Sequence, residues 1–284
     1  MTSTLVGAAL HDGAIGSLDD PCDLYLPQLY GSAYGGVTIR NVMRMCSGVA
    51  WREDDQPDGR SDVRRLGRAM VSRRPGSVLD LLCTRPRAQP QGVVFNYSTG
   101  ESCLLGAVVA AATGRPLADY GAETIWGPAG MEADGCWQLE CEDGLELGGL
   151  GVSACLRDVG RFGQLVLEDG AAFSGRRVLP TGWRDLAGQP DSAATAFGRL
   201  MPGSPAGYGY QWWALPDAPL ADGLHAGAFL AVGGYGQRIY INPAEQMVAA
   251  IQSAWRQLNS GEAEVETNAL LRAAVRALRP DPAS

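Results

Sequence analysis

The sequence predicts an α+β (mixed α/β) fold in which helices come first and an antiparallel sheet comes last. Apolar residues recur at helical spacing through much of the first 200 residues. Beyond residue 200 the pattern changes to short runs rich in β-branched and aromatic residues, which are typical of strands. Residues 262–278 return to helical spacing and would cover one face of that sheet. We expect a mostly helical region over 1–200 and a sheet region over 201–284.

Three of the four helices expected in the helical region have a recognisable end. Thr38 can cap the second helix, and Gly13 and Gly114 can stop the first and third, because glycine accepts the left-handed conformation that ends many helices. Residues 52–66 are charged and contain Gly and Pro, so we expect a surface loop there. The expected helices cover residues 1–11, 38–45, 99–113 and 156–168.

The sheet region contains four strand-like runs. Asn242 and Pro243 are turn-forming residues and predict a hairpin between the last two runs. The expected strands cover residues 208–215, 229–232, 238–241 and 247–255.

The charge of the chain excludes several classes of function. Its 23 cationic residues are all Arg, its 31 acidic residues give a net charge of −8, and it has no basic tract. An acidic chain of this kind is a poor candidate for binding nucleic acid or an anionic membrane. The longest near-apolar run, 104–112, is too short to span a bilayer. Since there is no Lys, this chain supplies no lysine base and no Schiff-base lysine.

Cysteine and histidine do not form a metal-binding or disulfide pattern. The seven Cys include only one close pair, Cys136 and Cys141, with no His nearby. We therefore expect reduced, structural cysteines and a cytoplasmic protein. Two His, His11 and His225, without clustered acidic partners make a metal-dependent hydrolase a weak alternative. We expect no metal and no organic cofactor.

Tyr97 lies where the chain enters its most apolar helix, and taken alone it would be a structural residue. A series of landmarks surrounds it. In chain order these are Leu5 to Ile15, Tyr25-Leu-Pro27, Thr38 to Gly48, Phe95-Asn-Tyr97, Gly114 to Tyr120, Trp126 to Met131, Gly149 to Asp158, Tyr208 to Trp213 and Gly234-Tyr-Gly-Gln237. In this order they resemble the serine hydrolases of the class C β-lactamase and penicillin-binding-protein superfamily. The ending Tyr-Gly-Gln-x-Ile-Tyr-x-x-Pro is similar to that of 6-aminohexanoate-dimer hydrolases and related esterases.

The resemblance implies an acyl-serine mechanism. A Ser at the start of a helix attacks an acyl carbon, while a Lys three residues on and a Tyr from a second loop move its proton. Two backbone N–H groups hold the developing oxyanion. By this resemblance Tyr97 is the catalytic tyrosine, and Gly234, Tyr235 and Gly236 occupy the place of the Lys-Thr-Gly-like strand segment. Gly234 is then the oxyanion donor, and an ungapped match gives Ala231 instead.

Two departures from the family pattern bear on the substrate. Thr99 stands where the family's tyrosine motif has Asn, which leaves a supporting hydrogen bond in doubt. Nylon-oligomer hydrolases have a Tyr after Glu-Asp in the loop that follows the Ser-Gly helix, and this chain has Glu53-Asp54-Asp55. This difference favours an ester or another small acyl substrate over an amide. The sequence leaves the oligomeric state open.

The family's Ser-x-x-Lys would lie just before Met1. Two interpretations follow. In the first, the complete protein is a serine hydrolase for small esters, amides or β-lactams, and the motif, a helix and two strands precede this chain. In the second, the chain is a catalytically inactive scaffold or gene remnant that keeps a ligand cleft between Tyr97 and Tyr235.

Overall fold

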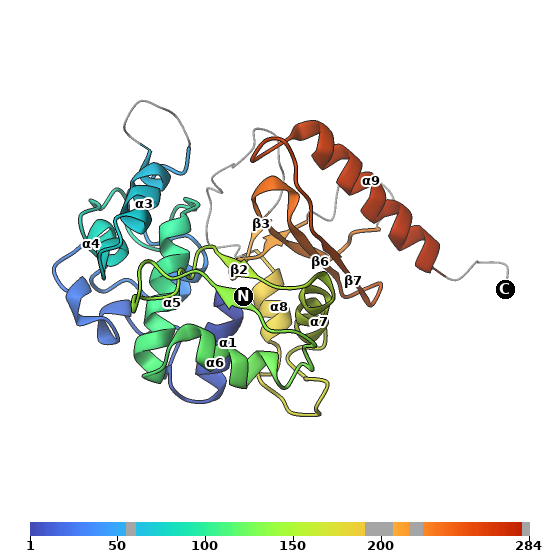
Figure 1. Ribbon diagram of the computed structural model, residues 1–284, viewed down its shortest axis with the longest axis horizontal. Helices are drawn as coiled ribbons and strands as arrows, with labels where there is room; N and C mark the ends of the chain where they lie inside the picture. Colours follow the sequence, from blue (N-terminus) through green and yellow to red (C-terminus); the bar gives the residue numbers. More distant parts are fainter. Residues whose placement is uncertain (55–60, 191–206, 216–223, 280–284) are drawn as a thin grey trace.

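The computed structural model describes residues 1–54, 61–190, 207–215 and 224–279. A helical part and a sheet part lie side by side (Figure 1), which confirms the α+β fold. The α-helices are α1 (Thr2–His11), α2 (Ile39–Met43), α3 (Asp62–Val71), α4 (Ser77–Cys83), α5 (Thr99–Thr113), α6 (Leu117–Gly121), α7 (Leu156–Leu167), α8 (Trp183–Gly188) and α9 (Gly261–Leu278). The strands are β1 (Cys136–Trp137), β2 (Val152–Ser153), β3 (Gly207–Tyr208), β4 (Trp213–Ala214), β5 (Phe229–Val232), β6 (Arg238–Asn242) and β7 (Met247–Ile251).

Helices α1 and α5 pack together at the centre of the helical part. The hydroxyl of Ser98 caps α5 by accepting the N–H of Glu101 at 3.2 Å. Gly114 ends the helix in the left-handed conformation (φ 65°). In α1, Gly7 lies against Trp183 so closely that an added Cβ would fall 2.6 Å from the indole. The first turn of α1 is buried, so this helix begins inside the molecule.

The large sheet is antiparallel throughout, with strand order β3-β4-β5-β6-β7. Helix α7 covers one face. Gly163 leaves room there for the sheet side chains, because an added Cβ would fall 2.5 Å from Val248 and 3.1 Å from Ile239. Helix α9 covers the other face, where Leu271 and Val275 pack with Tyr240. The expected C-terminal covering helix is therefore present, on the face opposite α7 (Figure 1).

Three expected elements have different bounds. Residues 208–215 form β3 and β4, not one strand, because the chain turns between them at Gln211 (φ 63°). Strand β7 ends at Ile251, short of Trp255. The loop expected over 52–66 gives way to α3 at Asp62, because Ser61 caps that helix through the N–H of Arg64. The expected boundary between the two regions, at residue 200, lies outside the described residues.

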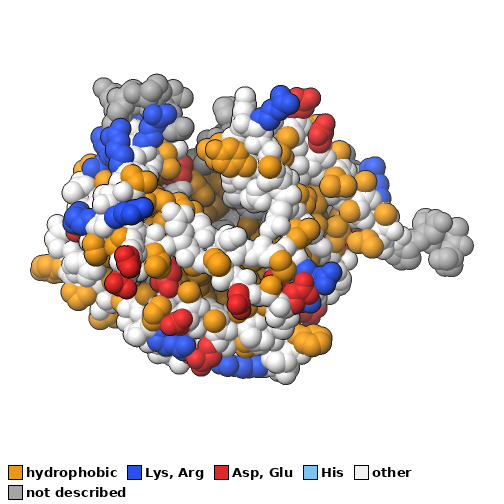
Figure 2. Space-filling view, in the orientation of Figure 1, with side chains coloured by type: hydrophobic (Ala, Val, Ile, Leu, Met, Phe, Trp, Pro, Cys, Tyr) orange, Lys and Arg blue, Asp and Glu red, His pale blue; other side chains and the backbone are white. Residues whose placement is uncertain are grey.

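Charge is unevenly spread over the surface. Basic side chains gather over α3 (Figure 2), which contributes Arg64, Arg65 and Arg68, although the chain as a whole is acidic. The same face is hollowed between the helical part and the sheet (Figure 2). Within the described part of the chain, no helix combines the length and the hydropathy needed to cross a bilayer.

Candidate active site

Tyr97 lies in the segment that leads into α5, and its ring belongs to an aromatic cluster formed by Phe95, Tyr97, Tyr208 and Trp213. The phenol ring stacks on Trp213 (centroids 5.7 Å apart, planes at 26°) and meets Tyr208 edge-on at 6.0 Å. The backbone N–H of Asn96 donates to the carbonyl of Met45 at 2.8 Å, which fixes the segment. Tyr97 is therefore held by its neighbours and does not point into open solvent.

The surroundings of Tyr97 disfavour its anion. Burial, followed by the Glu53 carboxylate, raises the pKa of Tyr97 to about 12. In this chain the phenol is therefore protonated at neutral pH. A cation placed beside it would be needed before it could accept a proton.

Glu53 supports the start of α5 next to Tyr97. One carboxylate oxygen accepts the hydroxyl of Thr99, and the other accepts the backbone N–H of Thr99 at 3.1 Å and the indole N–H of Trp51. Burial raises the pKa of Glu53. Thr99 thus has a hydrogen-bond partner at the position where the family pattern has Asn. The sequence did not indicate this pair, since nothing local connects residues 46 positions apart.

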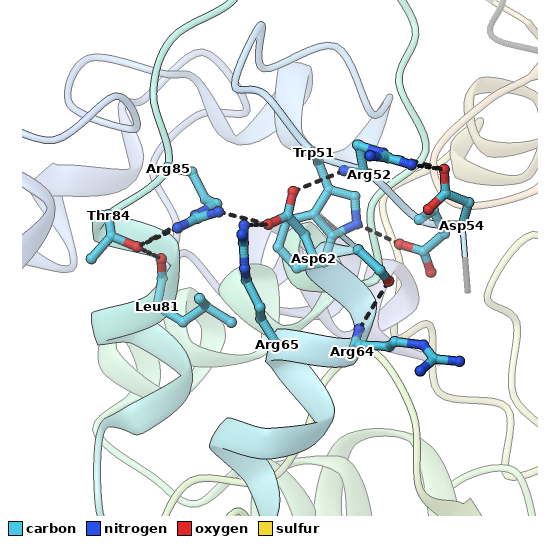
Figure 3. Close-up of polar contacts among 11 residues, drawn as sticks. Trp51, Arg52, Asp54, Asp62, Arg64, Arg65, Leu81, Thr84 and Arg85 are labelled. Atoms are coloured by element: carbon cyan, nitrogen blue, oxygen red, sulfur yellow. Dashed lines mark hydrogen bonds and ion pairs between the residues drawn. The ribbon is translucent and has the colours of Figure 1, made fainter. Parts of the chain in front are cut away.

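The segment that carries Glu53 is itself anchored by Asp62 (Figure 3). The buried Asp62 carboxylate accepts the backbone N–H of Arg52 at 3.0 Å and the guanidinium groups of Arg65 at 2.8 Å and Arg85 at 2.6 Å. Three donors satisfy the buried charge, which would otherwise be strongly unfavourable. These hydrogen bonds therefore hold the backbone next to the Trp51–Glu53 contact in place.

Gln211 connects the sheet to the first turn of α1. Its side-chain oxygen accepts the backbone N–H of Ser3 at 3.0 Å, and its side-chain nitrogen donates to the hydroxyl of Ser102 in α5 at 2.8 Å. Two residues later, Trp213 stacks on Tyr97. Tyr97 and the beginning of α1 therefore belong to one contact network.

The structure places Gly234, Tyr235 and Gly236 in the hairpin turn between β5 and β6, not in a strand. Tyr235 (φ 58°) and Gly236 (φ 90°) both adopt the left-handed conformation that a tight turn requires. The side chain of Tyr235 is half exposed, and its N–H donates to the carbonyl of Leu258 at 3.0 Å. That N–H is therefore engaged and does not serve as an oxyanion donor in this conformation.

Strand register decides which N–H groups of β5 face the aromatic cluster. The N–H of Gly233 donates to the carbonyl of Gln237 at 2.9 Å, so Ala231 and Ile239 form the next hydrogen-bonded pair. The N–H of Ala231 thus points toward β6. The N–H of Val232 points the other way, toward the side on which β4 pairs with β5 through Trp213 and Leu230. The register therefore engages the Ala231 N–H in the sheet, and it leaves the N–H of Val232, a residue that the sequence did not suggest, on the β4 side.

Among the described residues, the structure shows no group of three or more His, Cys, Asp or Glu side chains that could hold a metal ion. All seven cysteines are free thiols. The Tyr97 phenol and the nearby Glu53 carboxylate are groups that can transfer protons, and backbone N–H groups can stabilise an anion.

Comparison with known proteins identifies relatives in sequence and in structure. Over 261 residues the chain is 27% identical to the 6-aminohexanoate-dimer hydrolase of Paenarthrobacter ureafaciens, a match that covers 90% of this chain and 64% of that protein. A putative 6-aminohexanoate-dimer hydrolase from Bacillus anthracis has a similar structure, with a TM-score of 0.80 and 26% identity over 97% of this chain and 70% of that one.

A class C β-lactamase from Rhodobacter sphaeroides shares the fold, with a TM-score of 0.62 and 22% identity over 96% of this chain and 82% of that one. The chain spans just under two thirds of the length of the Paenarthrobacter hydrolase. Residues 1–274 match the family described as Beta-lactamase. This chain belongs to the β-lactamase family.

Proposed function

We propose that the chain carries the tyrosine and the sheet-side oxyanion donor of a serine hydrolase that cleaves small acyl substrates through an acyl-serine. The Ser-x-x-Lys motif is supplied by polypeptide that precedes Met1. The observation that carries this proposal is the contact network that joins Tyr97, through Trp213 and Gln211, to the buried first turn of α1. The family pattern places the serine and lysine just before this turn.

In the proposed reaction, the serine oxygen forms a bond to the acyl carbon and loses its proton to the Lys–Tyr97 pair. The carbonyl oxygen becomes an oxyanion, held by the N–H of Gly234 and the N–H of the serine. The bond from carbon to the leaving atom breaks, and the proton passes through Tyr97 to that atom. Water then repeats the sequence and frees the acid. The lysine ammonium would lower the pKa of Tyr97 from about 12 toward a useful value.

An ester or another small acyl compound fits the site better than an amide. Both oxygens of Glu53 are taken by Thr99 and Trp51, and Asp54 pairs with Arg52 at 2.7 Å. These carboxylates are therefore engaged within the protein and do not replace the amide-holding tyrosine of the nylon-oligomer hydrolases. Asp55 lies outside the described residues. The indole of Trp213, half-buried beside Tyr97, offers an apolar wall for an acyl group.

A second candidate function is an inactive ligand-binding scaffold. The absence of Lys and the raised pKa of Tyr97 favour it, because no cationic side chain of the described residues lowers that pKa.

A fluorophosphonate probe separates the two candidates. The protein is prepared with its native upstream sequence, and the labelled peptide is identified by mass spectrometry. A serine hydrolase is labelled at a serine preceding Met1 and turns over p-nitrophenyl acetate. An inactive scaffold stays unlabelled in the same extended form. Tyr30→Phe, at an exposed surface tyrosine, serves as the matched control for Tyr97→Phe and should leave labelling unchanged.

A further inference from the structure

We infer that Arg238, held by Glu264 of α9, is a positioning residue that sets the direction of the Gly234 N–H. The inference rests on the proposed function, in which this N–H stabilises the oxyanion. It assigns a role in the reaction to an ion pair that no part of the proposed mechanism uses.

Arg238 holds the peptide that joins Gly233 to Gly234. One guanidinium nitrogen of Arg238 (Nη1) donates to the carbonyl of Gly233 at 3.1 Å and to that of Gln237 at 2.9 Å. Gly233 is extended (φ −109°, ψ 158°) and the peptide bonds are trans. In a trans peptide the C=O and the N–H point in opposite directions. Holding the carbonyl of Gly233 toward Arg238 therefore turns the N–H of Gly234 toward β4.

The guanidinium is itself held in place. Arg238 is only 4% exposed, and its guanidinium lies over the indole of Trp255, with Cζ 5.1 Å from the ring centroid. Its other terminal nitrogen (Nη2) pairs with Glu264, in the first turn of α9. The planar guanidinium can bind a carboxylate, two carbonyls and an aromatic face at once, which an ammonium cannot do. The Arg238–Glu264 pair thus fixes the position of the turn relative to α9.

The segment before α9 holds the rest of the turn. The side chain of Gln237 donates to the carbonyl of Ser253 at 2.6 Å, and the N–H of Trp255 donates to the carbonyl of Tyr235 at 3.1 Å. An added Cβ on Gly236 would fall 2.4 Å from the Trp255 indole. These contacts fix the outer part of the turn. Among the described residues, Arg238 is the side chain that donates to the carbonyl of Gly233, so its loss should release that peptide while the hairpin remains.

The test uses the protein with its native upstream sequence, labelled with ¹⁵N, because the serine N–H of the proposed oxyanion site belongs to that sequence. Residual dipolar couplings report the direction of the Gly234 N–H. Titration with methylphosphonate, which mimics the tetrahedral oxyanion, reports through the Gly234 resonance whether this N–H binds the anion. Arg238→Met should change the Gly234 coupling and weaken methylphosphonate binding about tenfold, the scale of one hydrogen bond to an anion. Arg238→Lys can reach one carbonyl and should recover part of the loss.

The matched control is Arg279→Met. Arg279 joins the other end of α9 to Glu245 through an ion pair (Nε to Oε1, 3.0 Å) and does not touch the turn. It should leave both readouts unchanged. If Arg238→Met unfolds the chain, Glu264→Gln, which releases the guanidinium without removing it, takes its place.

The outcomes distinguish the two proposals. An unchanged Gly234 coupling in folded Arg238→Met or Glu264→Gln overturns the inference. An altered coupling with the control unchanged supports it. If methylphosphonate leaves the Gly234 resonance of the unmodified chain unmoved, the oxyanion role in the proposed function fails, whichever way the coupling responds.

Discussion

Replacing Glu101 by Gln should remove a pH-dependent loss of stability. Glu101 is 1% exposed in α5, where one oxygen accepts the hydroxyl of Ser47 and the other has no hydrogen-bond partner among the described residues. Burial raises its pKa from an ordinary 4.5 to about 8, and the Ser47 hydroxyl opposes that rise. The folded protein therefore holds this proton more tightly than the unfolded chain does.

The sign and size of this change in the unfolding free energy follow from the coupling between proton binding and folding. The stabilisation by the bound proton is complete below pH 4.5 and is lost as the pH rises to about 8, since the folded state binds more protons across that range. Each tenfold change in proton affinity corresponds to about 1.4 kcal/mol, so the loss reaches at most about 5 kcal/mol. A Gln side chain resembles the protonated acid and cannot ionise. Glu101→Gln should therefore be more stable than the unmodified chain at pH 9.

Urea denaturation at pH 5, 7 and 9 provides the measurement. The difference in unfolding free energy between Glu101→Gln and the unmodified chain should grow by several kcal/mol from pH 5 to pH 9. Glu142→Gln, at an exposed carboxylate, should keep the pH dependence of the unmodified chain. Parallel curves for Glu101→Gln and the unmodified chain would refute the reasoning.

Three further predictions concern the site and the surface. Gln211→Ala removes the partners of Ser3 and Ser102 and should lower the unfolding free energy by about 2 kcal/mol, with faster amide exchange at Ser3; unchanged exchange there would contradict the connection. Glu53→Gln removes a negative charge and should lower the pKa of Tyr97, seen as phenolate absorbance that Tyr97→Phe lacks. The exposed Val265 and the outer edge of β7, unpaired among the described strands, should make the chain bind ANS; a soluble monomer that melts cooperatively without binding ANS would argue against this.

Local signals in the sequence were sufficient for most helices and for the later strands. Gly114 marks the end of α5, and the last three strands of the sheet begin where the strand-like runs begin. The turn at Gln211 was missed because its positive φ is imposed by contacts with distant segments. The family resemblance located Tyr97, which composition and periodicity alone would have left as a structural residue.

The supporting residues of the site could not be predicted, because each acts across a long sequence separation. Glu53 meets Thr99, and Gln211 meets Ser3, only after α1, α5 and the sheet have packed. The direction of the Ala231 N–H depends on strand register, and a shift by one residue would reverse it. Sequence patterns fix which residues can do the chemistry, whereas packing decides which way they point.

We propose that the Tyr97 phenol completes a proton relay with the serine and the lysine of the family's Ser-x-x-Lys motif. The most direct test is the rate of acylation of the extended protein by p-nitrophenyl acetate, measured as the initial burst, for Tyr97→Phe and for the unmodified sequence. The account predicts a loss of about 10² or more in that rate, the usual contribution of a positioned proton-transfer group. An acylation rate that Tyr97→Phe leaves unchanged would contradict it.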